Sequence, residues 1–363
     1  MKTDPKQLVA ALKKYASLAT LIKGSPDPDA MACSFALKCV CDTLGIKNGI
    51  FAEKNISLPQ NRALVDKLDI PIKIPFPADL SKFDAYMIFD YQQARIPDIS
   101  EKLPCAVHID HHDASAEDVS CDMRIVDSSA GSASTIVALL LKELDLEIGR
   151  QAMTRMCTAL LYGIETDTDG YSHARKPDYE AIDYISKYSD TSLVKKISSI
   201  PLSKKTVSLL WTAMENITLY KDWLITGIGF IDESNRDSMP IIADFLTKRE
   251  DVALVVVFAA VEKSRGAGLA LDASFRTKNP GLDLDSIIKG ITETGGARKF
   301  KGALQIDLDF FTACPDRDAL WKIISATMTE ALKKRRDGIY ISGIKGYYRR
   351  LRNRIFWILK KGH

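Results

Sequence analysis

A short segment rich in histidine and aspartate is the strongest chemical feature of this 363-residue sequence. Residues 108–113 read His-Ile-Asp-His-His-Asp and hold three of the chain's five histidines. Imidazole and carboxylate groups side by side are the ligands that Mn²⁺, Fe²⁺ and Zn²⁺ select. A single histidine is usually an ordinary core or surface residue, but that explanation accounts poorly for three histidines beside two acids. The segment therefore predicts a metal site.

Three further groups of acids occur where apolar runs end. Asp27 and Asp29 stand two apart on a loop with two prolines, which could aim two carboxylates at neighbouring cations. Asp90 ends a second apolar run, and Asp167 and Asp169 follow a third. Each group alone also has an ordinary explanation, because Asp29 could simply cap the next helix and strand-ending aspartates are common. These residues by themselves leave both explanations open.

The chain around these acids alternates between strand and helix patterns, which is typical of an α/β fold with a mostly parallel, doubly wound sheet. Ligands bind beyond the carboxyl ends of parallel strands, so the acids are predicted to converge there. The predicted strands are 18–22, 85–89, 106–109 and 123–126, and the predicted helices are about 30–44, 132–144 and 153–164.

The length of the chain favours two domains. We predict the parallel α/β domain at 1–190, a polar helical connector at 191–216, a smaller α+β domain at 217–332 and a basic extension at 333–363. Within the smaller domain the predicted strands are 217–231, 252–260, 269–276 and 303–308, and the predicted helices are 237–247, 284–292 and 318–331.

Charge is distributed unevenly along the chain. Residues 333–363 hold eleven Lys or Arg and one acid, whereas the rest of the chain holds 39 basic and 46 acidic residues. Apolar residues recur in this extension at three- and four-residue spacing, which predicts a basic amphipathic helix. Such a helix could contact nucleic acid, an anionic membrane, the chain's own acidic body or a second copy in a homodimer. Docking on the body or on another subunit is the first expectation.

Cysteine usage and the N-terminus predict a cytoplasmic protein. The seven cysteines show no zinc-type spacing, so reduced and buried thiols are expected. The first residues lack the apolar core of a signal peptide, and no apolar run reaches membrane-spanning length.

The acidic and histidine motifs occur in an order that resembles the DHH phosphoesterases. The four segments are Pro26-Asp27-Pro28-Asp29-Ala30, Asp90, Asp110-His111-His112 and Gly163-Ile164-Glu165-Thr166-Asp167-Thr168. In the second half, Ser274-Phe275-Arg276-Thr277 and Gly295-Gly296-Ala297-Arg298 are similar to the Ser-x-Arg-Ser strand and the Gly-Gly-Gly-His segment of the DHH-associated substrate domain. The family includes RecJ-type exonucleases, nanoRNA and phosphoadenosine-phosphate phosphatases, and related phosphodiesterases.

The resemblance implies a two-metal site. One ion would be held by Asp27, Asp90 and Asp167, and the other by Asp29, Asp90 and His111. Asp110 and His112 would orient His111 and touch a phosphate oxygen. The expected cofactor is Mn²⁺, with one or two ions per chain and Mg²⁺ or Fe²⁺ as alternatives. Two such cations roughly 3.5–4 Å apart can activate water and neutralise charge on the phosphorus oxygens.

The resemblance also implies a phosphate-binding role for the smaller domain. Ser274, Arg276 and Arg298 would grip phosphate or nucleotide, and Gly295 and Gly296 would let the backbone approach an anion. The expected activity is metal-dependent hydrolysis of short oligonucleotides or small nucleotide phosphates. An exopolyphosphatase-like hydrolase acting on polyphosphate is the nearest alternative.

Two positions depart from the family pattern. Lys23 stands where the family usually has a metal-ligand histidine, and a protonated lysine cannot coordinate a metal. We expect the Lys23 ammonium in the catalytic site, near Asp27 and Asp167, where it replaces part of the charge of the first ion. Arg298 stands where the substrate domain usually has histidine, and arginine binds phosphate but is a poor proton donor. A catalytically weakened nucleotide- or phosphate-binding protein is therefore a further alternative.

Overall fold

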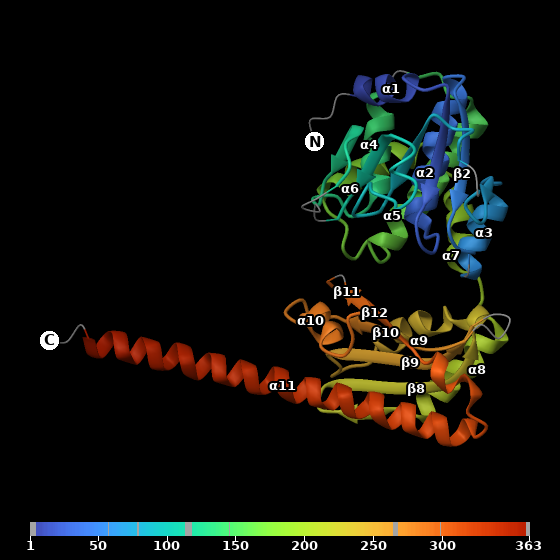
Figure 1. The fold of residues 1–363 in the computed structure, drawn as a ribbon. Coiled ribbons are helices and arrows are strands. Elements are labelled where there is room, and N and C mark those ends of the chain that lie inside the picture. The colour runs from blue at the N-terminus through green and yellow to red at the C-terminus, as the bar shows by residue number, and fades with distance from the viewer. Residues whose placement is uncertain are drawn as a thin grey trace. The chain divides into compact units, whose positions relative to one another are not determined.

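The computed structural model describes residues 5–56, 58–77, 80–112, 118–144, 146–263, 268–297 and 299–360, with side chains described only as far as residue 338 in the last range. The chain divides into two compact units, Met1–Pro201 and Leu202–His363. Each unit contains one six-stranded sheet (Figure 1). The predicted fold class is confirmed, with a parallel sheet in the first unit and a second sheet in the other.

The sheet of the first unit has the strand order β3-β2-β1-β4-β5-β6, and its neighbouring strands pair in parallel. Chain order reverses between β1 and β4, and this is the position at which open α/β sheets bind ligands. The strands are β1 (Ser17–Ile22), β2 (Lys47–Ala52), β3 (Ile72–Lys73), β4 (Ala85–Phe89), β5 (Cys105–Asp110) and β6 (Cys121–Val126).

Helices form the main core of the first unit together with alternate residues of the strands, such as Met87 and Val107. The most buried helix, α2, packs against α5 and α4, so its apolar residues do not follow a single stripe. The helices are α1 (Pro5–Lys13), α2 (Pro28–Thr43), α3 (Pro59–Lys67), α4 (Ala133–Glu143), α5 (Arg150–Asp167), α6 (Lys176–Ile185) and α7 (Thr191–Ser198).

The opposite face of this sheet, which carries Tyr86 and Ile88, is covered by the segment between β4 and β5. Ala94, Ile96 and Leu103 of that segment pack against these side chains. The Tyr86 hydroxyl also donates a hydrogen bond of 2.8 Å to the Ala94 carbonyl. The loop that follows β4 is therefore fastened to the sheet close to the end of that strand.

The second sheet has the order β11-β12-β10-β9-β8-β7, in which β8 and β9 are parallel and the other pairs are antiparallel. The single strand predicted at 217–231 is wrong, because Lys221 has a φ of 56° in a turn that pairs Tyr220 with Trp223. The strands are β7 (Thr218–Tyr220), β8 (Trp223–Asp232), β9 (Leu254–Glu262), β10 (Leu269–Thr277), β11 (Gly295–Ala297) and β12 (Lys301–Asp307).

Helices pack on both faces of the second sheet. α8 (Lys204–Glu215) and α9 (Ser238–Leu246) form one core with alternate residues of β9, and α10 (Leu284–Lys289) and α11 (Arg317–Lys360) form the other. Two short 3₁₀ helices, Glu233–Asn235 and Asp309–Ala313, complete the described elements.

The predicted connector at 191–216 is divided between the two units. α7 buries Val194 and Ile197 in the core of the first unit, whereas α8 buries Leu209 and Ala213 in the second. Each helix has an apolar face of its own, so the polar residues between these positions do not mark a separate element.

The helix predicted at 318–331 and the basic extension at 333–363 are one continuous helix, α11, as far as Lys360 (Figure 1). The apolar pattern predicted for the extension concerns side chains outside those that the structure describes. Among the described helices, none combines the length and apolar character needed to cross a membrane.

Candidate metal centre

The loop after β1 delivers two carboxylates in different ways. Asp27 is the N-cap of α2, and its side chain accepts a hydrogen bond of 2.8 Å from the Ala30 amide. Pro28 begins the helix, where its missing N–H costs nothing. Asp29 in the first turn of α2 is fully buried, so the helix cap is Asp27, and the alternative in which Asp29 merely caps this helix is wrong.

Asp29 caps a different helix from the one that contains it. Its two carboxylate oxygens accept hydrogen bonds of 2.7 Å from the amides of Ala133 and Ser134, the first residues of α4. The Ser132 side chain accepts from the next amide, that of Thr135, at 3.0 Å. The first amides of α4 therefore donate to protein groups and are not available to bind a phosphate.

Gly163 lets α5 approach this carboxylate closely. A Cβ atom at this position would collide with the Ser134 hydroxyl and would lie 3.3 Å from the Asp29 Cα. The small residue permits the close α2–α5 packing that brings the end of α5, and Asp167 with it, toward the centre.

Asp90 ends β4 in a left-handed conformation, with a φ of 50°. Aspartate tolerates this conformation better than most residues do, and strained backbone of this kind clusters at functional sites. Its amide bonds to the Ile109 carbonyl at 3.0 Å, and its carboxylate is buried. The turn directs the carboxylate toward His111, whose Nε2 lies 3.2 Å from Asp90 Oδ1.

His111 lies between Asp90 and Asp167 and contacts both carboxylates. Its Nε2 atom lies 3.1 Å from Asp167 Oδ2 in addition to its contact with Asp90. Ligand atoms of Asp29, Asp90, His111 and Asp167 all lie within 4.8 Å of one another. These four residues come from α2, β4, the end of β5 and α5, and the structure brings them together as the sequence predicted.

Burial and mutual repulsion disturb the protonation of this cluster. Burial, assisted by the charge of Asp167, raises the pKa of Asp29 to about 7. Burial and the charge of Asp27 raise the pKa of Asp90 well above its ordinary value. Burial lowers the pKa of His111, but its contacts with Asp167 and Asp90 outweigh that effect and raise it to about 11. The cluster therefore retains protons unless another positive charge is present.

The donor set fits a divalent cation. Asp90 Oδ1 and His111 Nε2 are buried, and among the described residues they form a close ion-pair contact with each other, and His111 Nε2 also with Asp167, but no hydrogen bond. Carboxylate oxygens with one imidazole nitrogen suit Mn²⁺ and related ions. Asp27 acts electrostatically on both Asp29 and Asp90 but lies outside the four-residue group, so its direct ligation stays a prediction.

Asp110 and His112 form a pair beside this group. His112 Nδ1 lies 2.6 Å from Asp110 Oδ1, and the His111 and His112 rings lie 4.3 Å apart between centroids. Asp110 thus orients His112, whereas the resemblance implied that Asp110 and His112 together orient His111. Burial favours the neutral Asp110 carboxyl, but the hydrogen bond from His112 and the charges of the three nearby histidines together outweigh this and lower its pKa. His112 Nε2 is left without a hydrogen-bond partner in the described structure.

Lys23 has a partner that the sequence analysis missed. Its ammonium forms an ion pair with Glu53, which follows β2, and the other Glu53 oxygen accepts from the Gly24 amide at 2.8 Å. The signal for Glu53 was its position, since it follows a strand of the same sheet as Asp90 does. Asn61 was missed too, and its side-chain amide donates to the Pro26 carbonyl at 3.1 Å.

The predicted phosphate-binding residues of the second unit lie on neighbouring strands. Ser274 pairs with Ala303 of β12, which pairs in turn with Gly296 of β11. Arg276 lies two residues beyond Ser274, and its guanidinium forms an ion pair with Asp244 of α9. Gly295 packs closely on β12, where a Cβ atom would lie 2.8 Å from the Ala303 carbonyl oxygen. Arg298 is outside the described residues.

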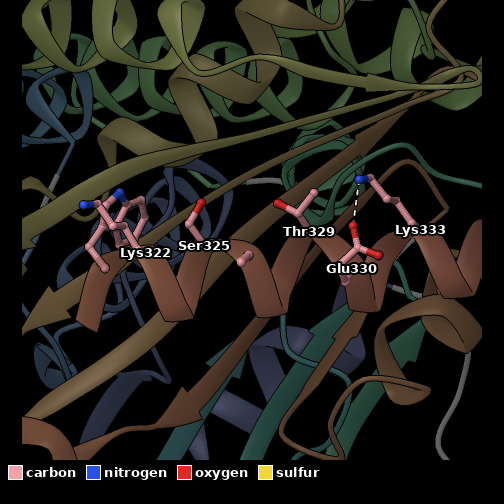
Figure 2. A pocket seen from close by; sticks show the side chains of 7 residues that line it. Lys322, Ser325, Thr329, Glu330 and Lys333 are labelled. Carbon is pink, nitrogen blue, oxygen red and sulfur yellow. Dashed lines mark hydrogen bonds and ion pairs between the residues drawn. The ribbon is translucent and has the colours of Figure 1, made fainter. Parts of the chain in front are cut away.

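A hollow of about 410 Å³ on the second unit has a different lining from these residues (Figure 2). It runs along α11 beside Ser325 and Thr329, and Lys333 forms an ion pair with Glu330 at its edge. None of the predicted phosphate-binding residues lines it, so it adds nothing to the site.

Known proteins resemble this chain in sequence and in fold. Residues 20–164 match the DHH family, N-terminal domain. The uncharacterized protein MJ1633 of Methanocaldococcus jannaschii is 31% identical over 315 residues, a match that covers 86% of this chain and 62% of that protein. The chain thus spans less than two thirds of the length of this relative.

Solved structures are also similar to this chain. An exopolyphosphatase-related protein from Bacteroides fragilis has a TM-score of 0.66 at 15% identity, covering 91% of this chain and 95% of the other. RecJ from Thermus thermophilus, in complex with Mn²⁺, has a TM-score of 0.49 at 11% identity, covering 91% and 53%. The family match contains the β1 loop, the end of β4 and the Asp110-His111-His112 segment. The first unit therefore contains a segment, residues 20–164, that matches the N-terminal domain of the DHH family.

Proposed function

We propose that this chain is a Mn²⁺-dependent phosphoesterase that hydrolyses short oligonucleotides or small nucleotide phosphates. The observation that carries the proposal is the group of Asp29, Asp90, His111 and Asp167, whose ligand atoms lie within 4.8 Å of one another. The family match supports a hydrolase acting on phosphoester bonds.

These residues would hold the cation, with Asp27 beside them. When bound, Mn²⁺ would supply Lewis-acid polarisation of a phosphoryl oxygen and would lower the pKa of water. The Asp29 carboxylate is fixed by two amides of α4, so it is already oriented for a ligand. His111 is fixed between Asp90 and Asp167, which set the direction of its Nε2 atom.

The Asp110–His112 pair would act on the substrate. With Nδ1 held by Asp110 at 2.6 Å, the His112 Nε2 atom is the one that faces away from its partner. It could donate a hydrogen bond to a phosphate oxygen, or a proton to a leaving group. Asp110 would stabilise the imidazolium form, because its buried carboxylate is ionised and adjacent.

The second unit would bind phosphate through the side chains of Ser274, Arg276 and Arg298. Gly295 and Gly296 would let the backbone at these positions approach the phosphate closely. Arg276 now pairs with Asp244, whose side chain is 53% exposed, so a phosphate would compete with a partly solvated carboxylate. Surface ion pairs of this kind are weak, and a bidentate phosphate contact can replace them.

The test is hydrolysis of four substrates with added Mn²⁺: a linear dinucleotide, a cyclic dinucleotide, phosphoadenosine-phosphate and inorganic polyphosphate. We expect turnover of at least one nucleotide substrate, and its loss when EDTA is added. Turnover of polyphosphate alone would favour an exopolyphosphatase-like function. Binding of Mn²⁺ and nucleotide without any hydrolysis would instead favour a nucleotide-binding protein, for which the Lys23–Glu53 ion pair at the histidine position is the motivating observation.

A further inference from the structure

His108 stands on β5 two residues before Asp110 and takes no part in the ligand group described above. It is fully buried, and it lies beside Ile88 of β4 in the register of the sheet. Its Nε2 atom lies 2.8 Å from the Tyr91 carbonyl oxygen. A carbonyl only accepts, so the His108 Nε2 atom carries a proton and donates it to the residue directly after Asp90.

Asp118 holds the next part of the same loop. Its carboxylate accepts hydrogen bonds from the amides of Ala94 at 2.7 Å and Arg95 at 2.9 Å. Arg124 of β6, which is the register neighbour of His108, pairs with Asp118 at 3.0 Å. His108 Nδ1 lies 4.0 Å from the same carboxylate. The loop after β4 is thus tied to β5 through His108 and to β6 through the Asp118–Arg124 ion pair.

We propose that His108 is a positioning residue for the metal site, which fixes the turn at Asp90 through its hydrogen bond to the Tyr91 carbonyl while Asp118 and Arg124 fix the loop beyond. The proposal rests on the proposed function, because it takes Asp90 as a metal ligand. His108 would affect metal binding indirectly, by holding the backbone that sets the direction of the Asp90 carboxylate.

The conformation of Asp90 is the reason such support is needed. A φ of 50° is unfavourable for a residue with a Cβ atom, so the turn persists only where surrounding contacts hold it. If the Tyr91 carbonyl is released, the turn at Asp90 can relax and its carboxylate changes direction. Loss of a partner that orients a ligand typically weakens metal binding about 10–100-fold.

The experiment compares two substitutions at His108 in the full chain. His108→Leu removes the donor and keeps an apolar side chain, whereas His108→Gln places an amide N–H near the position of Nε2. Mn²⁺ affinity is measured by calorimetry on metal-free protein, and amide exchange of Ala94 and Arg95 is measured without metal. Val107→Ala is the matched control, since Val107 precedes His108 on the same strand but packs in the core on the other face.

We expect His108→Leu to weaken Mn²⁺ binding at least tenfold and to speed exchange of the loop amides, while His108→Gln stays within about threefold of the unchanged chain. Val107→Ala should lower stability without changing Mn²⁺ affinity. Unchanged affinity in His108→Leu would overturn the inference, and so would equal losses in both His108 variants or in Val107→Ala. An unchanged chain that binds Mn²⁺ but hydrolyses nothing would reject the proposed function, and the affinity comparison would still decide the role of His108. A chain that binds no Mn²⁺ would overturn both.

Discussion

His111 Nε2 lies 3.1 Å from Asp167 Oδ2, although one residue follows β5 and the other ends α5. The same nitrogen is 3.2 Å from Asp90 Oδ1, so one imidazole links three separate elements. Without a cation, a proton on His111 balances part of the charge of the carboxylates around it. This arrangement makes the metal interpretation testable, because a bound cation must displace that proton.

Asp90 should be the most sensitive position in the centre. Asp90→Asn keeps the shape of the side chain but removes its negative charge. By the family resemblance, this carboxylate would contact both ions. We expect Mn²⁺ affinity to fall by more than the roughly 10–100-fold typical of an outer partner, and turnover to be lost. Both are measured by calorimetry and by the substrate assay.

The control for Asp90 must be an acid without a structural role. Asp84 is unsuitable, since its carboxylate accepts from the Ser17 amide at 2.8 Å and from the Ser17 hydroxyl at 2.9 Å. Asp66 on α3 is exposed, and Asp66→Asn should change neither affinity nor turnover. Equal losses in both variants would indicate a folding defect and not a metal role.

The stability of the metal-free chain should fall as pH rises. Asp29 has a folded pKa of about 7, above its ordinary value of 3.8, so its protonated form favours the folded state and this contribution is lost between about pH 4 and 7. His111 has a folded pKa of about 11, above 6.5, so its contribution is full below 6.5 and is lost on approach to 11. Mn²⁺ competes with these protons.

The increase in melting temperature on adding Mn²⁺ should therefore be larger at pH 8 than at pH 6. Calorimetric titrations in two buffers of different ionisation enthalpy should also show proton release on binding. An equal stabilisation by Mn²⁺ at both pH values, without proton release, would contradict binding at this cluster.

The sequence predicted the convergence of Asp29, Asp90, His111 and Asp167 because these residues follow apolar runs. β4 and β5 are buried along their whole length, so their ends could be located and the edge of the sheet inferred. The sequence could not predict that Asp29 would bond to the amides of α4, because that contact depends on how two helices pack. The role of Glu53 was not predicted either, because β2 is only half buried and its apolar pattern is weak.

The second unit shows where local pattern fails. The turn at Lys221 lacks glycine, proline or asparagine, and its positive φ is imposed by the pairing of β7 with β8. The short strand β11 was not among the predicted strands, yet Gly295 is required there by close contact with β12. Neither feature can be inferred without the neighbouring strand.

Arg276 should contribute to substrate binding more than to turnover. Arg276→Gln removes a charge-assisted contact, and such contacts are worth about 1.5–3 kcal/mol, or roughly 10–100-fold in affinity. We expect KM for a nucleotide substrate to rise by that factor while kcat changes little. Asp244→Asn should lower KM, because it frees the guanidinium from its present partner. Lys248→Gln, an exposed change after α9, serves as the control, and equal effects of all three would contradict the role.

The basic extension should be dispensable for folding. The α11 residues in the described core are Leu320, Ile324, Met328 and Leu332, all well before position 347. Deleting Tyr347 to His363 should therefore leave the melting temperature and the turnover of a small substrate unchanged. We expect the deletion to lower self-association in sedimentation velocity. A truncated chain that fails to fold would show that the extension is part of the core. If the deletion instead changes only binding to an oligonucleotide or to anionic vesicles, that ligand, and not a second copy of the chain, is the partner of the extension.

Lys23 provides the sharpest test of how many ions the centre holds. Its ammonium pairs with Glu53, whose other oxygen accepts from the Gly24 amide, so the loop before Asp27 is held by an ion pair at the position where a ligand histidine is usual in the family. We expect one tightly bound Mn²⁺ in the unchanged chain, at Asp29, Asp90 and His111. Lys23→His supplies a nitrogen ligand and removes a positive charge, so it should raise the count to two and increase the rate of hydrolysis.

Charge and ligation can be separated at this position. Lys23→Gln removes the ammonium but offers no imidazole, and its amide can still donate a hydrogen bond to Glu53. If the missing ligand limits the first site, Lys23→Gln stays at one Mn²⁺ and only Lys23→His gains the second. If repulsion by the ammonium is the limit, both variants gain it, because either change removes one positive charge beside the carboxylates. Metal counting by mass spectrometry under native conditions distinguishes these cases, and two tightly bound Mn²⁺ in the unchanged chain would refute the substitution argument for Lys23 altogether.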